Sequence, residues 1–308
     1  MEKHIIVVGG ATYDIFGRPY NKLIQQDSNI GIIKTSIGGV GKNIAENLVM
    51  LNHNVTMITC FGNDDMAPIV KKNILDSGIK LDVMKVENGS SPTYMYITDE
   101  NGDMQLAVAS MSIYDNVKEK DIDEKLPLIN SAALLVLDTN YSKESIEYLV
   151  NNAKVPIFLD CVSVGKARKT KDCTGKIHTI KANKIEAATL VDFEINSIED
   201  AKKAGDILLN RGSKQVFITL GEKGVLAMNK DEKIVVPSFK ADVKNTTGCG
   251  DSFMAGVVDG YLNNKTLKDT TIYGNAMAAL TCESETSVSK VINRMSIQEV
   301  LDKRSIND

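Results

Sequence analysis

The chain of 308 residues has no tryptophan, only three histidines and no long apolar run. A membrane-spanning helix needs about 20 consecutive apolar residues, so we expect no such helix and no membrane partner. The histidines, His4, His53 and His178, are far apart in the sequence and lack the close spacing typical of metal ligands. The first ten residues, MEKHIIVVGG, contain too short an apolar run for a signal peptide.

The sequence also lacks an excess of positive charge and the cysteine spacing of a disulfide framework. The formal net charge is -4 and no long basic block is present, which argues against nucleic acid and anionic membranes as partners. Five scattered cysteines, an odd number, do not form the pattern of a disulfide framework. We therefore expect a protein of the reducing cytoplasm. The hydrophobic content of 43% is ample for a large core.

Short β-branched runs alternate with stretches of helical periodicity along most of the chain. Such alternation predicts an α/β fold with a mostly parallel central sheet and helices on both of its faces. An Asn-Gly pair at residues 101–102 interrupts the alternation and predicts a hairpin. Together with residues 15–37, the hairpin segment at 92–112 would form a small β-sheet covering the crevice, within a single domain of residues 1–308.

The stretch NTTGCGD, residues 245–251, is a glycine-rich turn followed at once by apolar residues at helical spacing. A turn of this kind at a helix start presents free backbone N–H groups and the positive end of the helix dipole to an anion. Asp251 has the position of a carboxylate that accepts the proton of a hydroxyl attacking a phosphoryl group. From this stretch alone, an ordinary helix start with an acidic first turn is an equal alternative.

A second glycine-rich turn, GGVG at residues 38–41, precedes the amphipathic run at residues 44–51. It is not a Walker A loop, because Asn43 stands where Ser or Thr is required, and no G-x-G-x-x-G fingerprint occurs. Asn43 could contact a ligand as both donor and acceptor. Asp14, just past the first predicted strand, would face the ligand crevice of an α/β sheet. A solvated polar residue and a turn-stabilising aspartate are the alternatives at these two positions.

Two segments, GGVGKNIAENL at 38–48 and NTTGCGDSFMAG at 245–256, resemble the signature regions of the ribokinase-like (PfkB) carbohydrate kinase family. The resemblance extends over essentially the whole chain and implies a ribokinase-like α/β fold with a small β-sheet lid. Further segments resemble the pseudouridine kinase branch of that family: DSNIG at 27–31, ITDENGDMQLAVAS at 97–110, DCVSVGKA at 160–167, IHTIKANKIEA at 177–187 and ALTCESETSV at 279–288.

The resemblance implies an ATP-dependent phosphotransferase that uses Mg²⁺ and phosphorylates the 5′-hydroxyl of pseudouridine, giving pseudouridine 5′-phosphate and ADP. A small-molecule substrate and a homodimer are expected with it. Other kinases of the family, acting on ribose, fructose or adenosine, are the nearest alternatives, and a substrate panel separates them. A ligand-sensing pseudokinase without catalysis is a further alternative that a turnover assay decides. The missing dinucleotide fingerprint argues against a dehydrogenase.

The roles of the family carry over to matching positions of this sequence. Asp251 matches the catalytic base, and the residues that match the anion hole are Gly248, Cys249 and Gly250. The positions that match contacts to substrate hydroxyls are Asp14, Gly38, Gly39, Asn43 and Asp251. The positions that match the N-x-x-E motif, which orders magnesium indirectly through water or phosphate, are Asn183 and Glu186. The positions that match nucleotide contacts are Asn183, Thr219, Gly221, Gly224, Gly248, Gly250 and, near the adenine, Asn275.

Four positions depart from the family pattern. Cys249 replaces the usual alanine, and because a thiol at a helix N-terminus is activated, we expect either a reactive handle on the site or a packed, inert residue. Asn245 replaces a more frequent aspartate, which argues against the monovalent-cation (K⁺) site of the family without excluding it. Ala182 replaces the proline usual before Asn183, a backbone change of little chemical consequence. Ser110 replaces an aspartate expected in the pseudouridine branch.

Overall fold

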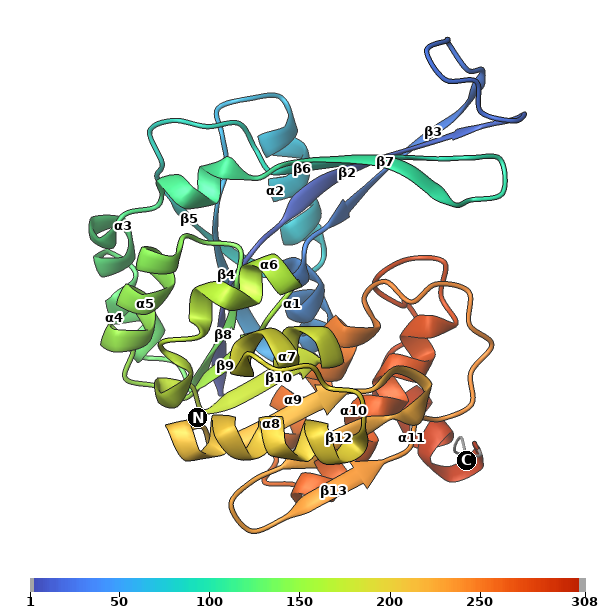
Figure 1. The fold of residues 1–308 in the computed structure, drawn as a ribbon. Coiled ribbons are helices and arrows are strands. Elements are labelled where there is room, and N and C mark those ends of the chain that lie inside the picture. Colours follow the sequence, from blue (N-terminus) through green and yellow to red (C-terminus); the bar gives the residue numbers. More distant parts are fainter. Residues whose placement is uncertain (1–2, 305–308) are drawn as a thin grey trace.

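The computed structural model describes residues 3–304 and has a nine-stranded sheet at its centre (Figure 1). The strands are β1 (His4–Val8), β4 (Asn54–Cys60), β5 (Lys80–Met84), β8 (Leu134–Asp138), β9 (Ile157–Asp160), β10 (Thr179–Asn183), β11 (Gln215–Thr219), β12 (Val225–Met228) and β13 (Lys233–Val236). They lie in the order β13-β12-β11-β10-β9-β8-β1-β4-β5. The neighbours from β11 to β5 run parallel, and β12 and β13 continue one edge as antiparallel strands. The mostly parallel central sheet predicted from the sequence is confirmed.

Alternate residues of the central strands feed two hydrophobic cores, one on each face of the sheet. In β1, Ile5 and Val7 belong to the first core and Ile6 and Val8 to the second, because successive side chains of a strand point to opposite faces. Strands that are buried on both faces therefore read as continuous apolar runs.

Helices cover both faces of the sheet. The helices that contribute to the first core are α1 (Val40–Met50), α2 (Met66–Asp76), α9 (Cys249–Leu262), α10 (Leu267–Cys282) and α11 (Arg294–Lys303). The helices that contribute to the second core are η1 (Ser112–Asn116), α3 (Glu119–Asp123), α4 (Leu126–Asn130), α5 (Lys143–Asn152), α6 (Val164–Ala167), α7 (Lys184–Val191) and α8 (Ile198–Arg211). The remaining short helices are η2 (Arg168–Thr170), η3 (Thr174–Lys176) and η4 (Gly221–Lys223). None of the helices described in residues 3–304 combines the length and the apolar character that a bilayer crossing requires.

A second, smaller sheet projects from the main body (Figure 1). Its four strands are β2 (Thr12–Pro19), β3 (Gly31–Gly38), β6 (Thr93–Thr98) and β7 (Met104–Ser110), in the order β3-β2-β6-β7. The β6–β7 pair is an antiparallel hairpin around the predicted Asn-Gly turn. The pair β6 and β7 lies within the predicted segment 92–112, whereas β2 begins three residues before and β3 ends one residue after the predicted segment 15–37.

Polar side chains gather past the carboxyl ends of the parallel strands, the edge at which open α/β sheets bind ligands. Asp138, Asp160, Asn183 and Thr219 are the last residues of β8, β9, β10 and β11. Asp14 follows β1 across a short connection. The sheet topology therefore assembles several of the predicted site residues at one edge.

Candidate active site

Helix α9 begins in the glycine-rich turn at residues 245–250. Gly248, the residue before the helix, has a φ of 85°, a left-handed conformation that glycine adopts readily. A Cβ at this position would lie 1.9 Å from the carbonyl oxygen of Ser287, so a side chain does not fit there. No side chain caps the start of α9. The N–H of Cys249 donates to the carbonyl oxygen of Thr246 at 3.3 Å, which leaves the N–H groups of Gly250 and Asp251 available to an anion.

Asp251 lies in the first turn of α9 and is 8% exposed. The side-chain amide of Asn43, on α1, donates a hydrogen bond to Asp251 Oδ2 at 2.8 Å. Burial raises the pKa of Asp251 to about 7 and Asp160 adds to this effect, whereas Lys181 and the hydrogen bond from Asn43 oppose it. A carboxylate that titrates near neutral pH is suited to act as a general base.

Lys181, which was not among the predicted site residues, places a positive charge beside the same turn. Its ammonium pairs with Asp160 Oδ2 at 2.8 Å and lies 2.8 Å from the point that a Cβ on Gly250 would occupy. Burial works to lower the pKa of Lys181, but Asp160 and Asp251 outweigh this and raise it, so the ammonium stays charged. The sequence signal for Lys181 was a charged residue inside a run that predicts a buried strand, because a buried charge requires a partner.

The predicted contacts for substrate hydroxyls meet where β2, β3 and α1 converge. Asp14 lies on β2, and burial raises its pKa to about 6. A Cβ on Gly38 would lie 2.2 Å from Asp14 Oδ2. Gly39 has a φ of 102°, and a Cβ there would lie 2.4 Å from a backbone oxygen of the connection after β1. Because Asn43 on the adjoining helix binds Asp251, the predicted sugar contacts and the predicted base form one contiguous group.

Two buried side chains, Asp138 and Tyr114, hold the predicted sugar contacts in place, and neither was among the predicted site residues. Asp138 Oδ2 accepts hydrogen bonds from the backbone N–H groups of Gly10 at 2.6 Å and Gly41 at 3.0 Å. The hydroxyl of Tyr114 accepts from the N–H of Ala11 at 2.9 Å and donates to its carbonyl oxygen at 3.1 Å. These bonds fix the connection after β1 against the start of α1. An aspartate that ends an apolar strand was the available sequence signal for Asp138.

Four of the predicted nucleotide contacts lie at or just past the ends of β10 and β11: Asn183, Thr219, Gly221 and Gly224. Asn183 and Thr219 are register partners on these strands, and Asn183 caps α7 in a reciprocal capping box with Glu186. Gly221 and Gly224, with φ values of 65° and 86°, lie in the turn after β11. A cavity of about 450 Å³ is lined by Asn183, Thr219 and Gly221 together with neighbouring residues of α7 and α8.

Asn275, predicted near the adenine, uses its side-chain amide on the backbone. The amide donates to the carbonyl oxygens of Val236 at 3.3 Å and Pro237 at 2.9 Å. A Cβ on Gly224 would lie 2.0 Å from the same oxygen of Val236. Asn275 therefore supports the end of β13, against which the turn at Gly224 packs. The contact of Asn275 with a nucleotide stays a prediction.

Asn183 and Glu186 are the residues predicted to order a metal ion indirectly. Within residues 3–304, no group of three or more His, Cys, Asp or Glu side chains could bind a metal. Burial raises the pKa of Glu186, and its Oε2 accepts from the backbone N–H of Asn183 at 2.8 Å. This arrangement fits the indirect role predicted for Asn183 and Glu186, because Mg²⁺ keeps several water ligands and is commonly bound through substrate phosphates.

Cys249 is joined to Cys282 by a disulfide bond, so both expectations for Cys249, a reactive free thiol and a packed, inert residue, were wrong. Cys249 is the first residue of α9 and Cys282 is the last of α10. The two helices pack against each other, which brings together cysteines that are 33 positions apart in the sequence. A spacing of that kind has no signature from which the pairing could be predicted. The free, buried cysteines of the described chain are Cys60, Cys161 and Cys173.

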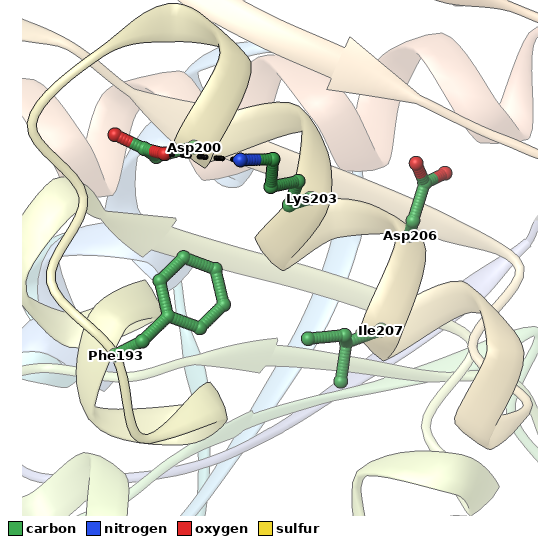
Figure 2. Close-up of a pocket in the computed structure, with 5 residues that line it drawn as sticks. All are labelled: Phe193, Asp200, Lys203, Asp206 and Ile207. Carbon is green, nitrogen blue, oxygen red and sulfur yellow. Dashed lines mark ion pairs between the residues drawn. The ribbon is translucent and has the colours of Figure 1, made fainter.

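A separate hollow of about 440 Å³ lies along α8 and contains none of the predicted site residues. Figure 2 shows the residues that line it, which are Phe193, Asp200, Lys203, Asp206 and Ile207. Asp200 and Lys203 form an ion pair at 3.6 Å, three positions apart on the helix. Pairs of this kind are common on solvated helix faces, and we assign this hollow no role.

Comparison with known proteins gives consistent matches over the whole chain. Residues 2–293 match the model of the pfkB family carbohydrate kinases. The chain is 30% identical to the pseudouridine kinase of Escherichia coli over 97% of its own length and 98% of that protein. A putative sugar kinase from Clostridium perfringens has a similar structure, with a TM-score of 0.88 and 33% identity over 99% of this chain and 98% of the other. The ribokinase of Arabidopsis thaliana, solved with ribose and ATP, gives a TM-score of 0.87 at 20% identity over 98% and 99% of the two chains.

Proposed function

This chain belongs to the pfkB family of carbohydrate kinases, and from that premise we propose that it phosphorylates pseudouridine. In the proposed reaction the γ-phosphoryl group of ATP passes to the 5′-hydroxyl of the ribose, giving pseudouridine 5′-phosphate and ADP. The observation that carries the proposed reaction is Asp251, buried at the N-terminus of α9 and hydrogen-bonded to Asn43. The choice of substrate is supported by the similarity to the pseudouridine kinase of Escherichia coli.

Asp251 acts as the general base in this mechanism. Its carboxylate accepts the proton of the 5′-hydroxyl as the hydroxyl oxygen attacks phosphorus. The backbone N–H groups at residues 248–250 and the ammonium of Lys181 stabilise the charge that develops on the transferring group. ATP supplies the phosphoryl group, and Mg²⁺ supplies positive charge against its phosphates. Because the protein has little covalent chemistry to perform, positioning and electrostatics carry the rate.

The other predicted residues bind and orient the two substrates. Asp14 accepts hydrogen bonds from ribose hydroxyls, and Asn43 holds both the ribose and Asp251. Asn183, Thr219 and the turn after β11 take the nucleotide, for which the cavity at the ends of β10 and β11 has room. The small sheet serves as a lid that excludes water during transfer and so suppresses hydrolysis of ATP. We place the reaction in the cytoplasm and assign the protein a homodimeric state.

A substrate panel tests the proposal. The measurement is kcat/KM from ADP release with pseudouridine, uridine, adenosine, ribose and fructose, each with saturating ATP and Mg²⁺. Pseudouridine differs from uridine by a C-glycosidic bond and an extra ring N–H, and a site with a buried acceptor for that N–H would leave the acceptor unpaired when uridine binds. An unsatisfied buried group costs about 1–3 kcal/mol, so we expect a preference of about one to two orders of magnitude. Ribose or fructose ahead of pseudouridine would refute the substrate while leaving the kinase reaction standing.

A further inference from the structure

Lys166 is a half-buried lysine whose hydrogen-bond partners are neutral. Its ammonium donates to Asn140 Oδ1 at 2.5 Å and approaches the sulfur of Met111 at 3.7 Å. In the part of the chain that the structure describes, no carboxylate lies within 4.0 Å of it. An ammonium has three N–H donors, and a thioether is a weak acceptor, so Lys166 has donor capacity left for a ligand. Lys181, by contrast, has a charged partner, because its ammonium pairs with Asp160 Oδ2 at 2.8 Å.

Lys166 and Asn140 lie at the edge of the sheet that carries the candidate site. Asn140 follows β8, and Lys166 lies on α6, which follows β9. The amide nitrogen of Asn140 is 2.5 Å from the point that a Cβ on Gly10 would occupy, in the connection that leads to Asp14. Met111 directly follows β7, the last strand of the small sheet. The ammonium of Lys166 therefore lies where the central sheet and the small sheet meet.

The connection from β9 to α6 holds a backbone conformation that costs free energy. Val162 has a φ of 59°, a left-handed conformation that is rare for a β-branched residue. Asp160 Oδ1 accepts a hydrogen bond from the N–H of Val162 at 3.0 Å, while Asp160 Oδ2 binds Lys181. Strained residues of this kind cluster at ligand sites, where the surrounding structure enforces them. One carboxylate thus shapes both the turn before Lys166 and the charge beside Asp251.

Asp251 and Lys166 lie on helices that cover opposite faces of the central sheet. Asp251 and Asn43 belong to α9 and α1, which cover the first core. Lys166 belongs to α6, which covers the second core together with η1 and Tyr114. Asn140, which binds Lys166, adjoins the Gly10 connection that leads to Asp14, so a substrate whose 5′-hydroxyl reaches Asp251 and whose ribose contacts Asp14 can extend its far end toward Lys166. On a nucleoside, the far end is the base.

We propose that Lys166 determines specificity by donating a hydrogen bond to a carbonyl oxygen of the substrate's nucleobase, with Asn140 holding its ammonium in position. This inference rests on the proposed function and adds the residue that distinguishes a nucleoside from a free sugar. A neutral carbonyl oxygen suits an ammonium whose other partners are neutral, because no second charge has to be buried. Uracil bases carry two such oxygens in both pseudouridine and uridine, so Lys166 serves both nucleosides equally.

Substituting Lys166→Met tests the assignment, with Lys169→Met as a matched control. Methionine keeps much of the length of the side chain and removes its charge and donors. Lys169 lies three positions away and donates to the backbone oxygens of Asn140 and Tyr141. We expect Lys166→Met to lower kcat/KM about 10- to 100-fold for pseudouridine and for uridine. The kcat/KM for ribose, the KM for ATP and the Tm should stay near those of the wild type. Lys169→Met should change kcat/KM for nucleosides and for ribose by the same factor.

If ribose turns over too slowly for a reliable kcat/KM, a binding measurement replaces the kinetic comparison. Calorimetry without ATP should show a Kd for pseudouridine raised about 10- to 100-fold by Lys166→Met. An equal loss of kcat/KM for all acceptors, or a raised KM for ATP, would make Lys166 a structural or phosphate-binding residue. That result would overturn the assignment of Lys166 but not the proposed function. A wild-type protein that prefers ribose or fructose to every nucleoside would overturn the proposed function, and the assignment of Lys166 with it.

Discussion

Lowering the pH from 8 to 6 should reduce kcat/KM about tenfold, because Asp251 must be ionised to accept a proton. Burial raises the pKa of Asp251 to about 7. The ionised fraction is then about nine tenths at pH 8 and about one tenth at pH 6. An ordinary aspartate, with a pKa of about 3.9, would be ionised throughout this range and would give no decline.

Two substitutions should move the midpoint of this decline in opposite directions. Asp160→Asn removes a negative charge that raises the pKa of Asp251, so the midpoint should move to lower pH. Asn43→Ala removes a hydrogen bond that lowers the pKa, so the midpoint should move to higher pH. An asparagine at position 160 can still accept a hydrogen bond from Lys181, which limits other changes at that position.

The assay is kcat/KM for the preferred acceptor, from ADP release at constant ionic strength between about pH 5.5 and 9. ATP also titrates in this range, but it contributes equally to the wild type and both variants, so the difference between the profiles belongs to the protein. A profile that is flat between pH 6 and 8 would refute the assignment of Asp251 as base. Shifts of the same sign in both variants would refute the electrostatic account of its pKa.

Two further predictions concern the start of α9. Asp251→Asn should lower kcat at least about 100-fold and raise the Tm at pH 8. Because the pKa of Asp251 is raised to about 7 in the folded protein, its contribution to stability is present below about pH 3.9 and is lost as pH rises through about 7. Near wild-type turnover, or a lower Tm at pH 8, would contradict this reasoning. Iodoacetamide should inactivate the enzyme only after a reductant has opened the disulfide bond between Cys249 and Cys282, and Cys249→Ala should be active and insensitive. Equal inactivation without reductant would show that the thiol is free.

The fold could be predicted from the sequence because its determinants are local. Continuous apolar runs and helical periodicity specify strands and helices over a few residues, and their alternation specifies a parallel sheet. Glycine-rich turns are local as well, so Gly38, Gly39 and Gly248 could be placed at helix starts before the structure was known. The left-handed φ values of Gly39 and Gly248 give the physical reason for glycine at those positions.

Side chains that meet through tertiary packing could not be found in the same way. Lys181 and Asp138 are single charged residues in apolar strands, and their partners come from other strands and helices. The bond between Cys249 and Cys282 depends on the packing of α9 against α10. Lys166 lay in a segment that marked a resemblance, but its neutral partners emerge only when β8, β9 and the end of β7 are brought together.

The separation of the core into two halves by the central sheet has a consequence for how such a protein changes over evolutionary time. Substitutions on opposite faces, farther apart than about 7–10 Å and without shared partners, add nearly independently in free energy. Mutations beneath α6 and η1 that leave Tyr114, Asp138 and Asp160 in place can therefore accumulate without disturbing the surroundings of α1 and α9. A lineage could exchange the molecule that it phosphorylates by altering one half, while the machinery of phosphoryl transfer is inherited unchanged in the other.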